Sequence, residues 1–282
     1  PAMNVTMYSS FAVQQNLERL KANGVHVLES PKGELACGET GEGRMAEPEE
    51  ILNALKNAKE VKNVCKNGKR VLITAGRTEE LIDPVRYISN RSSGKTATAI
   101  ASVFYEAGFD VTMVCGPMDV AAPGFSKVVN VRSAIEMHEA VLSRAKDYDV
   151  LVHCAAVADY RPAEVANEKI KDSRSQLHLD LIPNPNILRD SVAQKRKGQV
   201  VVGFALETEK PELHAKEKLE KSGADLLVLN MPVAKESGFG KDNVAFSLVE
   251  KGGAVPELQM ASKRDLALGI LRFTLLELEK TK

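Results

Sequence analysis

From residue 70 onward, short apolar runs alternate along the chain with longer segments whose apolar residues recur at helical spacing. The apolar runs are too short for helices and rich in β-branched residues, which is typical of buried strands. Strands that alternate with helices indicate βαβ units, so we predict an α/β fold with a doubly wound, Rossmann-like, mostly parallel sheet. The predicted strands are 71–74, 111–115, 150–154, 200–204 and 225–229, and the predicted helices are 94–107, 133–146, 211–221 and 263–279.

Two further segments, 177–182 and 244–249, alternate polar and apolar residues. A period of two predicts strands with one exposed face. We therefore expect both segments to be antiparallel strands added at an edge of the sheet.

The first part of the chain has a different pattern, with helices predicted over 16–22 and 49–58 and a short strand over 25–28. Four glycines between Gly33 and Gly43 favour a mobile loop, because glycine weakens helices and central strands. About 60 residues with one strand bury too little surface to fold alone. We therefore predict a fragment of a larger domain over 1–62, a linker over 63–69 and a complete second domain over 70–282.

The chain of 282 residues carries 38 basic and 38 acidic side chains, so its formal net charge is zero. It therefore lacks the basic surface of a nucleic-acid-binding protein, and 5% aromatic residues without tryptophan leave few base-stacking platforms. No apolar run reaches the ~18 residues of a membrane span, and no signal peptide is recognisable. The 4 cysteines form no CxxC pair, which argues against a zinc site or a disulfide framework. We expect a cytoplasmic protein with neither nucleic-acid nor membrane partners.

Polar or small residues follow several predicted strands, where open parallel sheets bind their ligands. Gly76 follows the first strand, and the run from Ser92 through Ser93 to Gly94 opens a helix whose N-terminus can hold an anion such as phosphate. Serine is also a preferred cap, so capping alone remains an alternative. The glycine spacing fits neither a P-loop nor a dinucleotide fingerprint.

Beyond strand 150–154, small alanines lead to Asp159, which can bind a hydroxyl or a metal ion or can pair with an arginine. Lys169 and Lys171 put two cations on one side of an extended segment, either as polyphosphate ligands or as a solvated charge run. Each signal is weak alone, but together they favour nucleotide binding at one face of the sheet.

Longer motifs at 83–94, 154–161, 168–171 and 239–243 resemble the phosphopantothenoylcysteine synthetase family. Residues 1–4 and 36–45 resemble the C-terminal part of phosphopantothenoylcysteine decarboxylase, a flavodoxin-like domain. The resemblance covers nearly the whole chain and implies a fusion of the two enzymes of coenzyme A biosynthesis. It implies that 4'-phosphopantothenate, CTP and Mg²⁺ form an acyl-cytidylate, from which cysteine displaces CMP.

The resemblance also implies roles for individual residues. Lys169 matches the lysine needed for forming the acyl-cytidylate, and Asn90 matches the asparagine needed to use it. Gly76, Ser92, Ser93 and Gly94 are the expected phosphate and substrate contacts, and Asp159 is the expected metal ligand. The family's nucleotide pocket corresponds to His153, Cys154, Ala155, Asp159, Lys169, Pro185, Asn186, Ile187, Leu188, Phe204, Lys218 and Ser222.

Three positions depart from the family pattern: Asp172 replaces the last cation of a lysine run, Ser222 replaces a lysine, and Ala97 replaces a glycine. Because a charged hydrogen bond to phosphate is worth ~1.5–3 kcal/mol, these changes bear on nucleotide affinity and base preference. An ATP-using ligase of the same fold and a non-catalytic binding or assembly module are therefore the alternatives.

In the decarboxylase family, Asn4 holds substrate and Cys37, in the glycine-rich stretch, protonates the product. A lone cysteine is otherwise an inert residue. We expect the flavin-binding part, with FMN and the catalytic histidine, to lie outside this chain, and hence no decarboxylase activity. The resemblance further implies a homodimer through the ligase domain, and a higher oligomer where the full decarboxylase domain is present.

Overall fold

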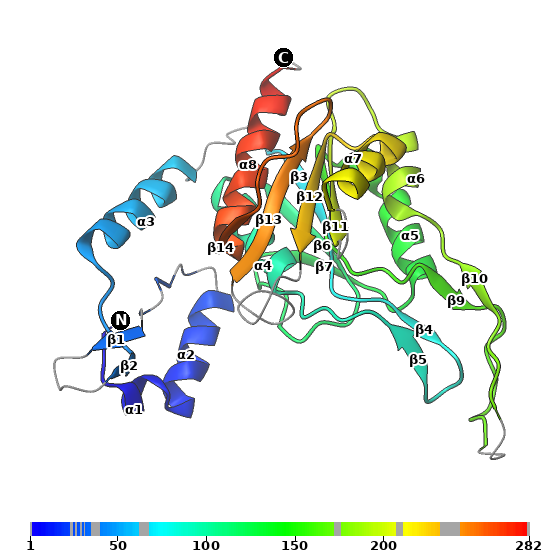
Figure 1. The fold of residues 1–282 in the computed structure, drawn as a ribbon, viewed down its shortest axis with the longest axis horizontal. Coiled ribbons are helices and arrows are strands. Elements are labelled where there is room, and N and C mark those ends of the chain that lie inside the picture. Colours follow the sequence, from blue (N-terminus) through cyan, green and yellow to red (C-terminus); the bar gives the residue numbers. More distant parts are fainter. Residues whose placement is uncertain are drawn as a thin grey trace.

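The computed structural model describes residues 2–22, 25, 27–28, 30, 32–34, 40–61, 68–171, 176–206, 211–231 and 243–280 (Figure 1). Its centre is one sheet of 8 strands, and the prediction of a mostly parallel sheet is confirmed. In spatial order the strands are β14 (Gln259–Ser262), β13 (Asn243–Glu250), β12 (Leu226–Met231), β11 (Val200–Leu206), β8 (Val150–His153), β3 (Arg70–Ala75), β6 (Asp110–Cys115) and β7 (Lys127–Asn130).

The strands from β12 to β7 pair in parallel, whereas β13 and β14 are antiparallel. The chain enters the sheet at β3, adds β6 and β7 on one side, and then adds β8, β11 and β12 on the other. The order therefore reverses between β3 and β8. In open α/β sheets, such a reversal marks the crevice in which ligands bind, so a site is expected beyond the carboxyl ends of these two strands.

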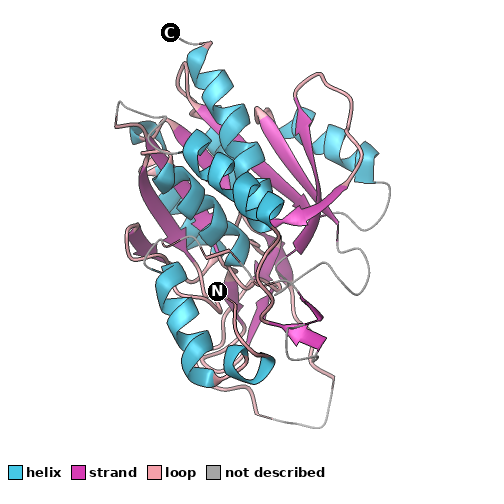
Figure 2. Cartoon of the chain, turned by 90° about the vertical axis from the view of Figure 1, so that its left-hand side faces the viewer, coloured by secondary structure: helices cyan, strands magenta, loops and turns pink. Residues whose placement is uncertain are grey.

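Helices cover both faces of the sheet, as Figures 1 and 2 show. On one face, α4 and α8 pack against Val71 and Ile73 of β3, while on the other α5 and α6 pack against Leu72. Successive strand residues thus face opposite helical layers, which explains why the strands are continuous apolar runs. The helices of this layer arrangement are α4 (Lys95–Glu106), α5 (Ala134–Leu142), α6 (Ile187–Ala193), α7 (Pro211–Ser222) and α8 (Lys263–Glu279), with a 3-10 turn at Ala145–Asp147.

Side-chain caps define where three of these helices begin. Ser133, Asn186 and Ser262 each accept a hydrogen bond from a backbone N–H three residues further on. The Asp265 carboxylate in turn accepts a hydrogen bond from the Ser262 backbone N–H, which completes a capping box at α8. Such a cap contributes about 1 kcal/mol, so the local sequence sets the starting points of α5, α6 and α8.

The N-terminal region forms its own small group of elements, and both of its predicted helices are confirmed. The predicted strand at 25–28 is wrong: Val25 and residues 27–28 are irregular, because no strand is available to pair with them in the part of this region that the structure describes. The glycine-rich stretch contains a two-stranded antiparallel hairpin rather than only a loop. The elements here are α1 (Val5–Tyr8), α2 (Phe11–Ala22), β1 (Lys32–Glu34), β2 (Thr40–Glu42) and α3 (Pro48–Val61).

The two segments expected as half-exposed antiparallel edge strands have different outcomes. Segment 244–249 belongs to β13, which is antiparallel and is added with β14 at one edge of the parallel strands, as expected. It is mostly buried rather than half-exposed, because Val244 and Phe246 pack in the core with α8 and Val249 packs with α7 on the other face. Of segment 177–182, only its last two residues are extended, and they belong to β10 (Leu181–Pro183), which pairs with β9 (Tyr160–Pro162) outside the main sheet.

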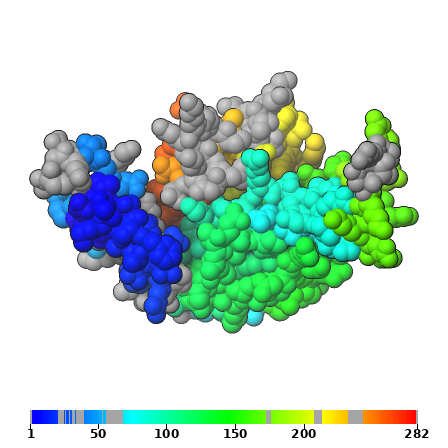
Figure 3. Space-filling model, turned by 90° about the horizontal axis from the view of Figure 1, so that it is seen from below, coloured from blue at the N-terminus to red at the C-terminus, as the bar shows by residue number. Residues whose placement is uncertain are grey.

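A second small ribbon joins β4 (Glu79–Leu81) to β5 (Tyr87–Ser89). Both ribbons lie at one side of the molecule, opposite the blue N-terminal helices, as Figures 1 and 3 show. Within the described ranges, no helix is both long and apolar enough to cross a membrane.

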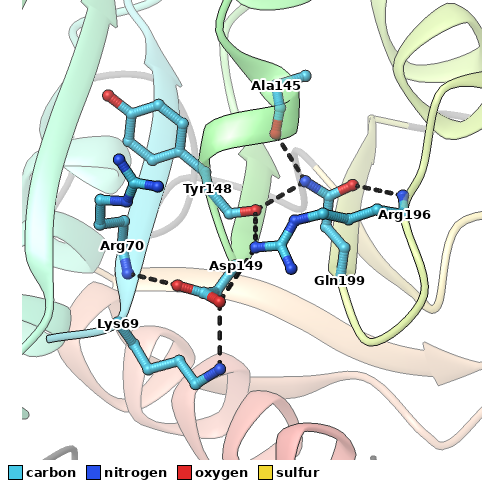
Figure 4. Close-up of polar contacts among 7 residues, drawn as sticks. All are labelled: Lys69, Arg70, Ala145, Tyr148, Asp149, Arg196 and Gln199. Atoms are coloured by element: carbon cyan, nitrogen blue, oxygen red, sulfur yellow. Dashed lines mark hydrogen bonds and ion pairs between the residues drawn. The ribbon is translucent and has the colours of Figure 1, made fainter. Parts of the chain in front are cut away.

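An ion-pair network ties together the starts of the central strands, at the edge of the sheet opposite the switch point (Figure 4). Asp149, before β8, accepts hydrogen bonds from the Arg70 backbone N–H at 2.9 Å and from Lys69 and Arg196, each at 3.1 Å. Burial raises the pKa of the Asp149 carboxyl, but these hydrogen bonds outweigh burial and hold the pKa below its ordinary value. The network therefore stabilises the sheet away from the candidate site.

Candidate functional site

The loops that follow β3 and β8 are joined by backbone and hydroxyl hydrogen bonds. The Ala156 N–H donates to the Gly76 carbonyl at 2.8 Å, and the Ala155 N–H donates to the Thr74 hydroxyl at 3.1 Å. A parallel bridge between Arg77 and Ala156 extends the pairing beyond the strands. The carboxyl ends of β3 and β8 are thus lined by backbone, and a ligand bound at the switch point would meet main-chain groups and small side chains.

Gly76 is required by this geometry, because its φ of +78° lies in the left-handed region. A Cβ at this position would lie 2.7 Å from the carbonyl oxygens of Gly116 and Pro117. The loop after β3 therefore packs directly on the loop after β6, and the structure gives Gly76 a packing role at the strand end.

The N-terminus of α4 lies beside the same loop, and neither Ser92 nor Ser93 caps it. The capping position is occupied by Gly94, with φ of +83°, and glycine has no side chain that could cap the helix. The serine-cap alternative is therefore wrong. The Arg77 guanidinium donates to the Ser92 carbonyl at 3.0 Å and fixes this segment against the end of β3. An N-terminus without a side-chain cap keeps its backbone donors available to an anion.

Asn90 follows β5 and faces the loop after β8. Its amide nitrogen donates to the Val157 carbonyl at 3.0 Å, although the residue is exposed. The structure therefore brings Asn90 together with the segment from Cys154 to Asp159.

The segment before α6 is also attached to the loop after β8. The Asn184 side-chain amide donates to the Ala158 carbonyl at 2.9 Å, and its backbone N–H donates to the Asp159 carbonyl at 2.8 Å. Pro185 is partly exposed, and the Asn186 side chain caps α6 by accepting from the Arg189 N–H at 3.0 Å.

The next two residues of α6 contribute packing rather than polar groups. Ile187 is buried in the core between α6 and the sheet. Leu188 is partly buried and approaches Gly203 of β11 so closely that a Cβ there would lie 2.7 Å from the Leu188 Cδ2 atom. Phe204 is likewise partly buried against the core on the other face. These side chains shape the wall at the carboxyl ends of β8 and β11.

His153 ends β8 and is held in one neutral form. Its Nε2 atom lies 2.9 Å from the Ser191 hydroxyl, which itself donates to the Leu188 carbonyl at 2.9 Å. Because the Ser191 hydroxyl proton is used in the bond to Leu188, the hydroxyl oxygen accepts from His153. Nε2 therefore carries the histidine proton, and Nδ1 is an acceptor. Burial lowers the pKa of His153 to about 4, and Nδ1 is buried without a hydrogen-bond partner in the described structure. This free acceptor suits an amino or hydroxyl group of a ligand.

The thiol of Cys154, the next residue, is unreactive. Burial raises the pKa of its thiol to about 12, and the nearby Lys263 ammonium opposes the shift without reversing it. A protonated thiol is a poor nucleophile, so Cys154 is a wall residue rather than a reactive one.

Asp159 is exposed, and its carboxylate makes no ion pair with any residue in the described ranges. The adjacent Arg161 instead donates to the Pro183 carbonyl at 2.7 Å and to Asn184 Oδ1 at 3.1 Å. The predicted arginine pairing of Asp159 is therefore not formed. The described residues contain no group of 3 or more metal-ligating side chains, so Asp159 would hold a metal only together with ligand oxygens.

Lys169 and Lys171 are exposed. They belong to the segment between β9 and β10, which extends away from the main sheet in Figure 1. The residue between them, Ile170, is hydrogen-bonded to Asp83 and Arg86 at the turn between β4 and β5. Asp83 and Ser191 had no role in the sequence-based site, although the motif 83–94 includes Asp83.

Other predicted residues are not brought to the strand ends by any described contact. Lys218 is exposed on α7, and Ser222 ends that helix, where its hydroxyl donates to the Leu219 carbonyl at 3.2 Å. Asn4 caps α1 by accepting from the Met7 N–H at 2.9 Å. Cys37 and Asp172 lie outside the described residues.

Comparison with known proteins covers nearly the whole chain. The family model of the DNA/pantothenate metabolism flavoprotein C-terminal domain matches residues 66–276, and the model named Flavoprotein matches residues 1–59. The first match spans every strand of the central sheet.

Individual relatives and structures agree with these matches. The coenzyme A biosynthesis bifunctional protein CoaBC of Haemophilus influenzae is 42% identical over 281 residues, covering 100% of this chain and 70% of the relative. A cysteine/cysteine sulfinic acid decarboxylase from an unknown prokaryotic organism is 38% identical over 276 residues, covering 96% of this chain and 77% of the relative. The crystal structure of a CoaBC C-terminal domain superimposes with a TM-score of 0.64 at 38% identity, covering 76% of this chain and 99% of that domain.

Proposed function

Because this chain belongs to the DNA/pantothenate metabolism flavoprotein family, we propose that it is a phosphopantothenate–cysteine ligase of coenzyme A biosynthesis. A carboxylate oxygen of 4'-phosphopantothenate attacks the α-phosphorus of CTP and expels pyrophosphate. The cysteine amine then attacks the acyl carbon, loses a proton and releases CMP. One observation carries the proposal: the family-matched residues Asn90 and His153 to Asp159 gather at the switch point between β3 and β8, where this fold binds ligands.

The anionic reactants define what the site must supply. Two negative groups have to meet in the first step, so cations and backbone donors are needed to offset their repulsion. We assign Lys169 to the developing charge at the α-phosphate, because its ammonium makes no ion pair with any described residue. The uncapped N-terminus of α4 at Gly94 is a second candidate anion cradle, for a substrate phosphate.

Asn90 serves the second step. One amide N–H holds the loop after β8 through the Val157 carbonyl, which leaves its second N–H and its carbonyl oxygen for the acyl intermediate. An amide stabilises an oxyanion without adding charge, so Asn90 can orient the acyl carbon for attack by cysteine.

The nucleotide base would lie against the wall formed by the start of α6 and the ends of β8 and β11. The free acceptor Nδ1 of His153 complements a base amino group or a ribose hydroxyl, and partly buried Leu188 and Phe204 supply apolar surface. Cytosine and adenine both carry an amino group, so this contact alone favours neither nucleotide. Competition between CTP and ATP distinguishes the two ligases.

Mg²⁺ fits the site only as a partner of the triphosphate. Mg²⁺ is usually held by one or two carboxylates together with phosphates and water, and the exposed carboxylate of Asp159 meets that need. When bound, the ion would neutralise phosphate charge.

FMN has no comparable place: in residues 2–61, the described strands form only an antiparallel pair, whereas a flavodoxin-like domain holds flavin beside a parallel sheet.

We further propose that two copies of the chain pair through the β9–β10 and β4–β5 ribbons. Both ribbons lie at one side of the molecule and expose large apolar side chains, which is typical of an interaction surface. The residues are Val85, Tyr87, Tyr160, Leu181 and Ile182, which are between 38% and 58% exposed. Sedimentation of the wild type against Tyr160→Asp tests the pairing, and a wild-type monomer at all concentrations would rule it out.

Product analysis tests the ligase. The chain is incubated with 4'-phosphopantothenate, cysteine and each nucleoside triphosphate in turn, and pyrophosphate, CMP and the amide product are quantified. We expect all three products with CTP in equal amounts. Product formation with ATP but not with CTP supports the alternative ligase, and no product with any triphosphate supports the binding-module alternative.

A parallel incubation with phosphopantothenoylcysteine and FMN tests for decarboxylation, where release of CO₂ would contradict the expected inactivity.

A further inference from the structure

Asp83 is a wholly buried carboxylate at the turn between β4 and β5. Its Oδ1 atom accepts hydrogen bonds from the backbone N–H groups of Val85 and Arg86, both at 2.8 Å. Its Oδ2 atom accepts from the Arg86 guanidinium and, at 3.1 Å, from the backbone N–H of Ile170. The carboxylate therefore links this turn to a segment 87 residues further along the chain.

Ile170 is also held through its backbone carbonyl. The Arg86 guanidinium donates to the Ile170 carbonyl at 2.6 Å, and the Ala166 N–H donates to the Ile82 carbonyl at 3.0 Å. Asp83, Arg86 and Ile170 thus form a latch in which both backbone groups of Ile170 are fixed. Lys169 directly precedes the latched residue, so its backbone is fixed as well.

A local turn does not explain all of these contacts. The Oδ1 bonds alone would make an Asx turn, and they would leave Oδ2 free to face water. Instead Oδ2 is buried, with a charged partner and a long-range backbone donor. A buried carboxylate is costly unless such partners are in place, so the latch acts as a unit. The side-chain hydrogen bond from Arg86 outweighs burial and, with the three backbone donors, holds the pKa of Asp83 well below its ordinary value, so the latch stays charged at neutral pH.

We propose that Asp83 is a positioning residue that, through Ile170, holds Lys169 where it meets the α-phosphate during acyl-nucleotide formation. This inference rests on the proposed function and extends it to a residue that touches no reactant. The latch and Asn90 lie at opposite ends of β5, which at ~3.3 Å per residue separates them by roughly 13 Å.

The test compares Asp83→Asn with a matched variant, Asp149→Asn. Asparagine at 83 keeps an acceptor for the turn but presents an NH₂ group to Ile170 and Arg86, which are donors. Asp149 also accepts a backbone N–H and pairs with two cations, but at the opposite edge of the sheet (Figure 4). We expect Asp83→Asn to slow pyrophosphate release about ten- to a hundredfold, because small displacements of a reacting group cost that much. Asp149→Asn should lose stability while keeping the wild-type rate in the folded fraction.

A double-mutant cycle separates positioning from general destabilisation. If Asp83 acts through Lys169, the double variant Asp83→Asn with Lys169→Gln loses no more activity than Lys169→Gln alone. Hydrogen exchange should also show faster exchange at Ile170 in Asp83→Asn, with the strand ends unchanged. Three outcomes would each overturn the inference. The first is a double variant whose activity falls by the product of the two single losses, and the second is unchanged hydrogen exchange at Ile170. The third is a loss of activity in Asp83→Asn no larger than that in Asp149→Asn. The wild type and Lys169→Gln report on the proposed function separately: no pyrophosphate from the wild type, or full activity in Lys169→Gln, refutes that function itself.

Discussion

The Nε2 atom of His153 lies 2.9 Å from the hydroxyl oxygen of Ser191, which joins the carboxyl end of β8 to α6. This bond fixes the imidazole as a neutral group with its proton on Nε2. Protonating Nδ1 would place a charge where burial disfavours it, and this is why the pKa of His153 falls to about 4.

Stability should therefore decline as the pH falls from 6.5 to 4. In that range the unfolded chain binds a proton at residue 153 that the folded chain does not, so the free energy of unfolding rises with pH. The loss across the range is about 3 kcal/mol at most. Chemical denaturation at pH 7, 6 and 5 should show a smaller slope for His153→Gln than for the wild type.

Ser191→Ala is the matched control, because it removes the hydrogen-bond partner but keeps the histidine. It should cost about 1–3 kcal/mol at every pH while retaining the wild-type slope. An identical slope in wild type and His153→Gln would contradict the assignment of a neutral histidine.

Lys169→Gln should slow acyl-cytidylate formation at least a hundredfold without unfolding the protein. Removing one group that stabilises a developing charge typically costs a hundredfold or more, whereas exposed residues contribute about 0.5 kcal/mol or less to stability. Pyrophosphate release measures the first effect and thermal denaturation the second. Lys251→Gln, in the exposed turn after β13, removes a cation elsewhere and should keep wild-type activity. Equal rates for Lys169→Gln and Lys251→Gln would refute the role of Lys169.

Asn90→Asp should uncouple the two half-reactions. The new carboxylate cannot donate to the Val157 carbonyl and repels a developing oxyanion, so acyl-cytidylate should accumulate while amide product falls. The ratio of pyrophosphate to CMP, measured with and without cysteine, reports the uncoupling. Thr78→Val provides the control, because the Thr78 hydroxyl accepts from the Ala158 N–H at 3.0 Å and anchors the same loop. A ratio raised equally in both variants would show that only loop anchoring matters.

The sheet and its helices could be predicted because each central strand is a continuous apolar run flanked by an amphipathic helix. The failures share a cause in long-range contacts. Residues 25–28 have a strand's composition but no pairing edge among the described elements. Segment 244–249 is antiparallel as expected, but it is buried on both faces because α8 and α7 pack against it. Neither fact is encoded within the segment itself.

The site was predictable in part, since the resemblance pointed to Asn90 and the loop after β8, which the structure joins. The latch was not predictable, because Asp83 and Ile170 are 87 residues apart and neither residue type signals the pairing. The alternative of a serine cap on α4 fails for a local reason. Serine is the commoner cap, but the left-handed backbone at Gly94 leaves no room for a side chain beside Met118.

Gly76→Ala should disrupt the switch point by two separable effects. The first is the left-handed backbone, with φ of +78°, which costs an alanine about 1 kcal/mol. The second is the clash of its Cβ with the carbonyl oxygens of Gly116 and Pro117, which adds about 1–3 kcal/mol if the loop after β6 has to shift. Chemical denaturation gives the sum of the two.

Gly252→Ala isolates the first effect, because Gly252 has φ of +76° and nothing within 4 Å of an added Cβ. We expect Gly76→Ala to be the more destabilised variant and to bind CTP at least tenfold more weakly by calorimetry, since its loop supports Ala156 at the switch point. Gly252→Ala should bind CTP as the wild type does, because its turn follows β13, away from the loops after β3 and β8. Equal stability and equal CTP affinity in the two variants would mean that the loops at the switch point do not need the close approach that Gly76 permits.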